Sequence, residues 1–202
     1  RGEVRIGGAP ISRMSEEQLA AFRQRHLGFV FQSYNLVPSL TAAENVAMPL
    51  LFRVVPPAQR DAAARAMLKR VGLGHRMDHY PAQMSGGQQQ RAGIARAFIA
   101  RPDVVFADEP TGNLDSKTTV EIMDMICSFS RDYHQTIILV THDPEMASYA
   151  DRIVTLLTVF SASSPSSSFW PWPRRLSRWP PGPRAEICTS PATPSPTPAT
   201  AR

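Results

Sequence analysis

The heptapeptide VVFADEP, residues 104–110, contains four apolar residues followed by two adjacent acids, Asp108 and Glu109. A short segment that is apolar at every position is typical of a strand buried on both faces of a parallel sheet. Residues 137–140, IILV, form a second such run, which leads into Thr141 and His142. In open parallel sheets ligands bind beyond the carboxyl ends of the strands. The two acids and the histidine are therefore candidate functional residues at one edge of a sheet.

Two adjacent carboxylates at such an edge can divide the chemical work. The first, Asp108, can hold a Mg²⁺ ion, as an acid after an apolar strand does in phosphate-loop NTPases. The second, Glu109, can orient or deprotonate a water molecule. The alternative is that the acidic pair only ends the strand.

Helix-start signals separate the strand-like segments. Capping boxes at Ser15 and Thr41 start two helices, because each N-cap residue and the residue three positions later satisfy free amides of the first turn. Pro57 starts a third helix. Further helices are expected over 88–100, 117–131 and 144–150, and further strands over 3–6, 27–31 and 152–156. Strands that alternate with helices predict an α/β fold with a mainly parallel core sheet.

Composition divides the 202 residues into two parts. Residues 161–202 contain all three tryptophans, ten of the nineteen prolines and a net charge of +4, whereas residues 1–160 carry only +1. The basic balance thus belongs to a tail, and we expect no nucleic-acid-binding face on the folded part. Two cysteines cannot form a disulfide framework, and Cys127 is expected to be a buried, inert thiol. No apolar run reaches the roughly 18 residues of a membrane span, and no signal peptide is recognisable.

Both ends of the chain are unusual. The Ser/Pro/Arg-rich residues 161–202 show no helical or strand period, and we expect this tail to be disordered because its few apolar groups cannot offset the ordering entropy. A coding region read in a shifted frame would explain the abrupt change after Leu156, and a natural disordered extension is the alternative. The chain also begins at Arg1 without a methionine, so we expect its natural start to be missing.

The segment MSGGQQQR, residues 84–91, is a second candidate site. The N-terminus of a helix presents free amides and the positive end of the helix dipole, which favour an anion. Gly86 and Gly87 would let a phosphate approach the backbone closely. The alternative is an ordinary helix cap.

The order and spacing of these segments resemble the ABC-transporter ATPase family over about residues 1–156. The matching pieces are Phe31-Gln32 (the glutamine loop), MSGGQQQR (the signature), VVFADEP (the Walker B strand), GNLDS from Gly112 (the D-loop) and VTHD from Val140 (the switch histidine). The resemblance implies a phosphate-loop NTPase-like α/β domain with a helical signature subdomain over residues 1–160. FVFQSYNLVPSLTAAENV and ADEPTGNLDS look most like the branch of macrolide-export, lipoprotein-release and cell-division-type exporters.

The resemblance also implies a role for each matching residue. Asp108 would hold Mg²⁺, Glu109 would be the general base, and His142 would contact the γ-phosphate of ATP. Gln32 would touch the metal and report the state of the site to an integral membrane permease. In a head-to-tail dimer with a second ATPase subunit, Ser85, Gly86, Gly87 and Gln88 would clamp the partner's nucleotide, with Asp115 in the interface. Such a subunit would lie at the cytoplasmic face of the inner or plasma membrane.

The loop after Gln32 is expected to contact that permease. Residues 33–46 include Tyr34, Leu36, Val37 and Leu40, an apolar cluster on a connection where polar residues would be ordinary. The alternative is that these side chains fold back onto the helix that Thr41 starts.

One part of the family pattern is missing. The string G-x-x-x-x-G-K-[ST] does not occur, and neither of the two lysines, Lys69 and Lys117, follows a glycine. The first strand, phosphate loop and helix of the fold are therefore expected to be absent, and the chain alone is expected to be inactive. Two other functions stay open: a soluble ABC ATPase without transport, and a non-enzymatic remnant that keeps the motifs.

Overall fold

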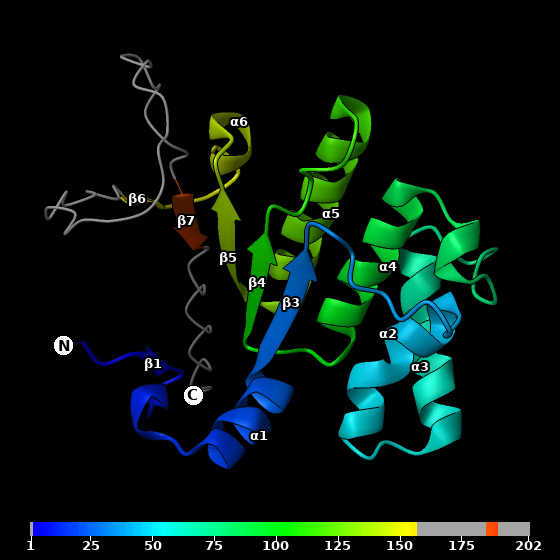
Figure 1. Cartoon of the computed structure of the whole chain (residues 1–202), viewed down its shortest axis with the longest axis horizontal. Coiled ribbons are helices and arrows are strands. Elements are labelled where there is room, and N and C mark those ends of the chain that lie inside the picture. The colour runs from blue at the N-terminus through cyan, green and yellow to red at the C-terminus, as the bar shows by residue number, and fades with distance from the viewer. Residues whose placement is uncertain (1, 157–184, 190–202) are drawn as a thin grey trace, which may run out of the picture.

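The computed structural model describes residues 2–156 and the backbone of residues 185–189, and it has an α/β fold (Figure 1). The α-helices are α1 (Glu16–His26), α2 (Ala42–Phe52), α3 (Pro57–Arg70), α4 (Gly86–Ile99), α5 (Ser116–Tyr133) and α6 (Pro144–Ala147). The strands are β1 (Arg5–Ile6), β2 (Ala9–Pro10), β3 (Leu27–Phe31), β4 (Val104–Asp108), β5 (Thr136–Thr141), β6 (Ile153–Leu156) and β7 (Ala185–Thr189). Short 3₁₀ turns cover Ile11–Arg13 and Pro81–Gln83.

The main sheet has the strand order β3-β4-β5-β7-β6. Strands β3, β4 and β5 are parallel, as the apolar runs predict. Their register pairs Phe31 with Asp108 and Asp108 with Val140, so the three strands end side by side. Residues that follow these strands therefore share one edge of the sheet.

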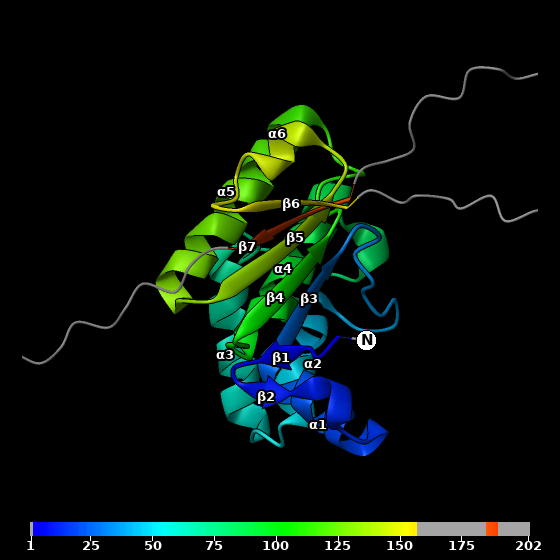
Figure 2. The same cartoon turned by 90° about the vertical axis from the view of Figure 1, so that its left-hand side faces the viewer.

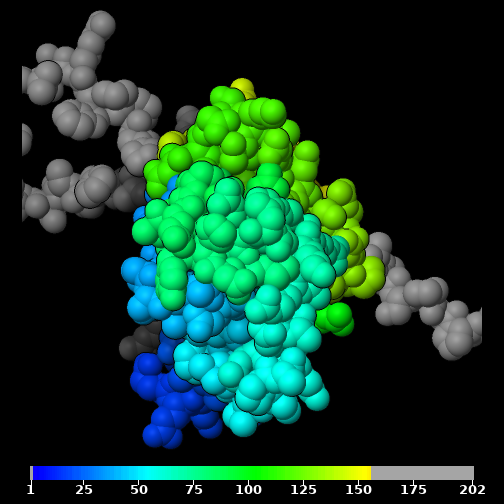
Figure 3. Space-filling model, turned by 90° about the vertical axis from the view of Figure 1, so that its right-hand side faces the viewer, coloured from blue at the N-terminus to red at the C-terminus, as the bar shows by residue number. Residues whose placement is uncertain are grey.

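One face of the sheet packs against α4 and α5, and α2 and α3 form a further layer on α4 (Figure 1). Val30, Val105 and Ala107 point from the sheet into this core, where Phe98 of α4 and Phe129 of α5 stack at 5.1 Å between ring centroids. Viewed from the helical side, α2 and α3 form a continuous surface with α4 and α5 (Figure 3). The helical layer matches the helical subdomain that the family resemblance implies.

The opposite face of β3, β4 and β5 carries no helix of the described residues (Figure 2). Phe29 lies on this face, is 36% exposed and stacks with Phe31 and Phe106, at 5.9 and 5.6 Å between ring centroids. The expectation of strands buried on both faces is thus wrong for the described residues. An all-apolar run shows that both faces suit burial, but neighbouring elements decide which face is covered.

The antiparallel strand β7 lies between β5 and β6. The expectation that residues 161–202 lack regular structure is therefore wrong for Ala185–Thr189. Backbone pairing supplies the reason, since β5 and β6 would otherwise each present a row of unpaired amide and carbonyl groups. The rest of the expected tail, and the expected change of reading frame after Leu156, lie outside the described residues.

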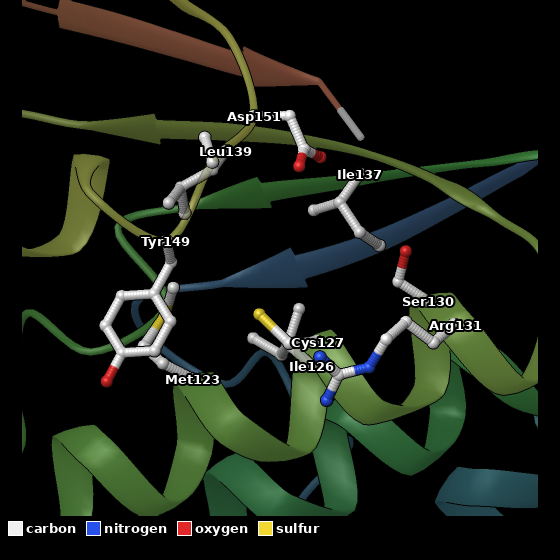
Figure 4. Close-up of a pocket in the computed structure, with 10 residues that line it drawn as sticks. Met123, Ile126, Cys127, Ser130, Arg131, Ile137, Leu139, Tyr149 and Asp151 are labelled. Carbon is white, nitrogen blue, oxygen red and sulfur yellow. The ribbon is translucent and has the colours of Figure 1, made fainter. Parts of the chain in front are cut away.

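The predicted helix starts are confirmed at Ser15 and Thr41, which both form capping boxes. A cavity of about 160 Å³ lies between α5 and β5, with Cys127 and Tyr149 in its lining (Figure 4). Burial raises the pKa of the Cys127 thiol, in keeping with an unreactive cysteine. No helix among residues 2–156 is long and apolar enough to span a membrane.

Candidate functional site

The carboxyl ends of β3, β4 and β5 place Gln32, Asp108, Glu109 and His142 at one edge of the sheet. Asp108 is the last residue of β4 and is exposed. Gln32 follows Phe31, whose register partner is Asp108. The sequence prediction that these residues share one edge is therefore confirmed.

Glu109 and His142 are in direct contact. The Nδ1 atom of His142 lies 2.5 Å from Oε1 of Glu109, and the His142 backbone amide donates to the same oxygen at 2.9 Å. The Thr141 hydroxyl donates to Oε2 of Glu109 at 3.3 Å. The glutamate side chain is only 20% exposed, whereas that of the histidine is 63% exposed. This pair joins a carboxylate to an imidazole that faces solvent.

The backbone of Glu109 has a φ of 43°, in the left-handed region that few residues other than glycine adopt. Its amide donates to the Val140 carbonyl at 2.9 Å, which continues the β4–β5 pairing through the turn. Strained residues of this kind concentrate at functional sites, where the surrounding structure holds them in place. The strain turns the carboxylate toward β5 and His142.

Gln32 is held by the loop that follows β4. Asn113 donates from Nδ2 to the Gln32 carbonyl at 3.1 Å, and Gln32 Nε2 lies 3.5 Å from Asn113 Oδ1. A Cβ atom on Gly112 would lie 2.7 Å from Gln32 Nε2, so the glutamine side chain crosses directly over this glycine. Only a residue without a side chain allows this close approach.

The signature turn, Ser85–Gln88, begins α4. The Ser85 hydroxyl accepts from the Gln88 amide at 3.3 Å, and the Gln88 side chain accepts from the Ser85 amide at 3.0 Å. The turn is thus a helix cap, as the simpler interpretation predicts. The cap also leaves Gly86 and Gly87 as the first two residues of the helix, where amides favour an anion.

Asp115 caps the next helix, α5. It accepts from the Thr118 amide at 3.0 Å and from the Thr118 hydroxyl at 2.7 Å. The hydrogen bond from the Thr118 amide, followed by that from its hydroxyl, lowers the pKa of Asp115. A Cβ on Gly87 would lie 2.9 Å from the Thr118 methyl group, so the starts of α4 and α5 are close together.

The expected residues therefore form two groups. Gln32, Asp108, Glu109 and His142 lie at the sheet edge, whereas Ser85–Gln88 and Asp115 lie at the starts of α4 and α5. Among residues 2–156, no hydrogen bond joins Ser85–Gln88 to Asp108, Glu109 or His142. Two separate groups are what a shared site between two subunits requires.

Sequence reasoning missed several residues that support these groups. Gln90 is fully buried in α4 and donates to the Pro110 carbonyl, directly after Glu109. Thr141 and Asn113 bond to Glu109 and Gln32. The only sequence signal for them was their position next to the motifs.

The loop after Gln32 differs from its expected exposure. Tyr34, Leu36, Val37 and Leu40 are all partly buried, and Leu36 packs against the core. The buried Asn45 side chain holds the loop by accepting from the Val37 amide at 2.7 Å and donating to the Val37 carbonyl at 3.1 Å. The alternative, that this loop folds back onto α2, describes the structure better.

An α/β sheet with an acid–histidine pair at its carboxyl edge, next to a glycine-rich helix start, defines a phosphate-handling class of protein. The family model for the ABC transporter matches residues 1–112, and the chain belongs to this family. The ATP-binding protein YbbA of Escherichia coli K12, named as an uncharacterized ABC transporter protein, is 51% identical over 156 residues, which are 77% of this chain and 68% of YbbA. The lipoprotein-releasing ATP-binding protein LolD of Geobacter metallireducens is 46% identical over 77% of this chain and 69% of its own length.

A macrolide export protein, MacB of Marinobacter nauticus, is 48% identical over 77% of this chain and 24% of its own length. Among solved structures, a dimeric ATP-binding cassette in a post-hydrolysis state with ADP and Pi has 39% identity and a TM-score of 0.67. That match covers 74% of this chain and 66% of the cassette. The chain thus spans about two thirds of the length of these ATPase relatives, and its fold is that of an ABC ATPase cassette.

The family implies ATP and Mg²⁺, and the described residues fit them in part. Asp108 and Gln32 offer the oxygen atoms that Mg²⁺ prefers, and this ion usually takes few protein ligands beside water and phosphate. In agreement, residues 2–156 contain no cluster of three or more His, Cys, Asp or Glu side chains that could hold a metal alone. The signature turn fits a phosphate group. The lysine-bearing phosphate loop, however, has no counterpart in the sequence.

Proposed function

We propose that this chain forms part of the ATP-hydrolysing subunit of an ABC exporter. The subunit works in a head-to-tail dimer, beneath a separate membrane permease, at the cytoplasmic face of the membrane. The observation that carries this proposal is the Glu109–His142 pair, because it joins an acid and an imidazole at the sheet edge directly after Asp108. The names of the relatives LolD and MacB support an export role.

In this proposal Glu109 is the general base that takes a proton from the attacking water. A positioned base of this kind contributes about 10²- to 10⁴-fold to a rate. His142 contacts the γ-phosphate through its exposed ring and keeps Glu109 oriented. Asp108 and Gln32 hold the Mg²⁺ ion, which when bound neutralises charge on the phosphates. Gln32 also senses the metal and passes its state to the permease.

The second half of the proposal concerns the signature turn. Gly86 and Gly87 open α4 with free space for a phosphate and with the positive end of the helix dipole. These residues, with Ser85 and Gln88, bind the nucleotide held by the opposite subunit, and Asp115 lies in the dimer interface. A chain that lacks a phosphate loop still offers this half-site to a complete partner.

Mixing this chain with full-length YbbA, Mg²⁺ and a non-hydrolysable ATP analogue tests that half-site directly. We expect a nucleotide-dependent heterodimer, measured by size-exclusion chromatography with light scattering. Ser85→Arg should abolish it, because the arginine side chain would fill the phosphate position. Ser15→Arg is the matched control, since Ser15 is also an N-cap serine with a capping box.

Equal heterodimer formation by the Ser85→Arg and Ser15→Arg variants would contradict the assignment of the signature turn. The absence of any heterodimer, under conditions in which YbbA pairs with itself, would contradict the proposed shared site.

A further inference from the structure

Tyr34 lies between the two groups of candidate site residues. It follows Gln32 by two positions, in a turn closed by the hydrogen bond from its amide to the Phe31 carbonyl at 3.3 Å. Its side chain reaches the signature turn, because a Cβ on Gly86 would lie 2.7 Å from Tyr34 Oη and 3.6 Å from Tyr34 Cζ. The phenol thus lies against the first residue of α4.

Arg96 of α4 attaches the same loop to the middle of the helix. Its guanidinium donates to the Tyr34 carbonyl at 2.9 Å and also to the Asn35 carbonyl. Burial lowers the pKa of Arg96, which shows that this contact is largely shielded from water. Tyr34 and Asn35 have φ angles of 61° and 48°, so the arginine holds a loop whose backbone is strained.

Gly93, one turn before Arg96 on α4, allows this loop to pass close to the helix. A Cβ there would lie 3.5 Å from the Tyr34 carbonyl oxygen, in ordinary van der Waals contact. The loop therefore touches α4 at its start through the Tyr34 ring and in its middle through the Tyr34 and Asn35 carbonyls. A shift of the loop backbone must be accompanied by a shift of α4, or these contacts break.

We propose that Tyr34 is a positioning residue that couples the Gln32 loop, residues 32–35, to the signature turn. The inference rests on the proposed function, in which Gln32 responds to the subunit's own metal and the signature turn binds the partner's nucleotide. Through Tyr34 the two half-sites of one subunit move together. Arg96 keeps the loop on α4 so that the movement is transmitted.

A double-mutant cycle tests the contact without nucleotide. Gly86→Ala should lower the unfolding midpoint of this chain by roughly 3–10 °C, since its Cβ would overlap Tyr34 Oη. Tyr34→Phe should have little effect. The double variant should unfold within about 2 °C of Tyr34→Phe, because the remaining ring carbon lies at an ordinary 3.6 Å. A double variant as unstable as Gly86→Ala would overturn the coupling.

Amide hydrogen exchange tests whether Tyr34 positions the turn. Tyr34→Ala should speed exchange at residues 86–88 about tenfold or more, because the turn loses the ring that packs on it. Tyr149→Ala is the matched control, since Tyr149 is also half-buried but lies against the cavity beside α5. Unchanged exchange at residues 86–88 in Tyr34→Ala would overturn the proposal.

The heterodimer with YbbA tests the consequence for nucleotide-dependent pairing. Tyr34→Ala should weaken pairing about tenfold, and Tyr149→Ala should leave it unchanged. Equal affinities of the two variants would overturn the coupling. If the unsubstituted chain forms no heterodimer while the double-mutant cycle and exchange behave as expected, the positioning role stands and the proposed function fails.

Discussion

Asn45 shows how a single buried side chain fixes the loop that follows Gln32. It is fully buried at the start of α2 and makes four hydrogen bonds, with the Val37 amide and with the carbonyls of Val37, Leu40 and Thr41. This residue accounts for the partial burial of a loop whose apolar content suggested a surface. Any contact between this loop and a permease would therefore use a fixed, preformed shape.

Asn45→Ala should lower the free energy of unfolding by about 1–3 kcal/mol, because it leaves backbone groups of the loop without their partner. Asn45→Asp is an informative second variant. A carboxylate can still accept from the Val37 amide but cannot donate to the three carbonyls, so this variant should be destabilised too. Chemical denaturation measures both, and a stability equal to that of the unsubstituted chain would show that Asn45 does not hold the loop.

The sequence is sufficient to predict Asp108, Glu109 and His142 as neighbours, because parallel strands bring their carboxyl ends to one edge. It does not predict Tyr34 or Arg96, because their contacts join segments about sixty residues apart and depend on left-handed backbone at Tyr34 and Asn35. The left-handed backbone of Glu109 is equally invisible in the sequence.

At the scale of elements, the close approach of β3 and α4 sets the position of the site edge. A Cβ on Gly28 would lie 2.6 Å from the Ala97 carbonyl oxygen and 3.0 Å from Pro102. The glycine is therefore required by packing, not by its backbone freedom. The strand can lie this near to the helix only because Gly28 has no side chain.

Gly28→Ala should destabilise the chain by about 1–3 kcal/mol or more, since a backbone carbonyl cannot move aside as a flexible side chain can. Gly93→Ala in α4 is the matched control. Its Cβ would have an ordinary contact at 3.5 Å, and alanine favours a helix by about 0.5–1 kcal/mol. Thermal unfolding should separate the two variants in opposite directions, and similar midpoints would contradict the packing account.

Element boundaries were predictable where local chemistry sets them. Ser15, Thr41 and Pro57 start helices through caps and a fixed φ, and residues 27–31 form β3 as expected. The antiparallel β7 was not predictable, since its pairing with β5 and β6 depends on residues about thirty or more positions away. Nor does an apolar run reveal that one face of the sheet carries no helix of the described residues.

For the molecule as a whole, the structure holds the half-site groups but the sequence holds no phosphate loop. Its two lysines, Lys69 and Lys117, lie in α3 and α5. Three missing charge-assisted hydrogen bonds, at about 1.5–3 kcal/mol each, correspond to more than a thousandfold in affinity. A site for ATP therefore has to be completed by residues that this chain does not contain.

Isothermal calorimetry of this chain with Mg-ATP should show no binding in the micromolar range. Full-length YbbA, measured in the same buffer, provides the comparison. Micromolar binding by the chain alone would mean that described residues hold the phosphates in some other way.

The most direct test of the account is ATP turnover by this chain joined, at Arg1, to the part of YbbA that precedes the matched region. We expect hydrolysis, and we expect Glu109→Gln to reduce its rate by about 10²- to 10⁴-fold while ATP binding is retained, because only the base is lost. A Glu109→Gln variant that turned over at the parent rate would contradict the assignment of Glu109 and, with it, the function proposed for this chain.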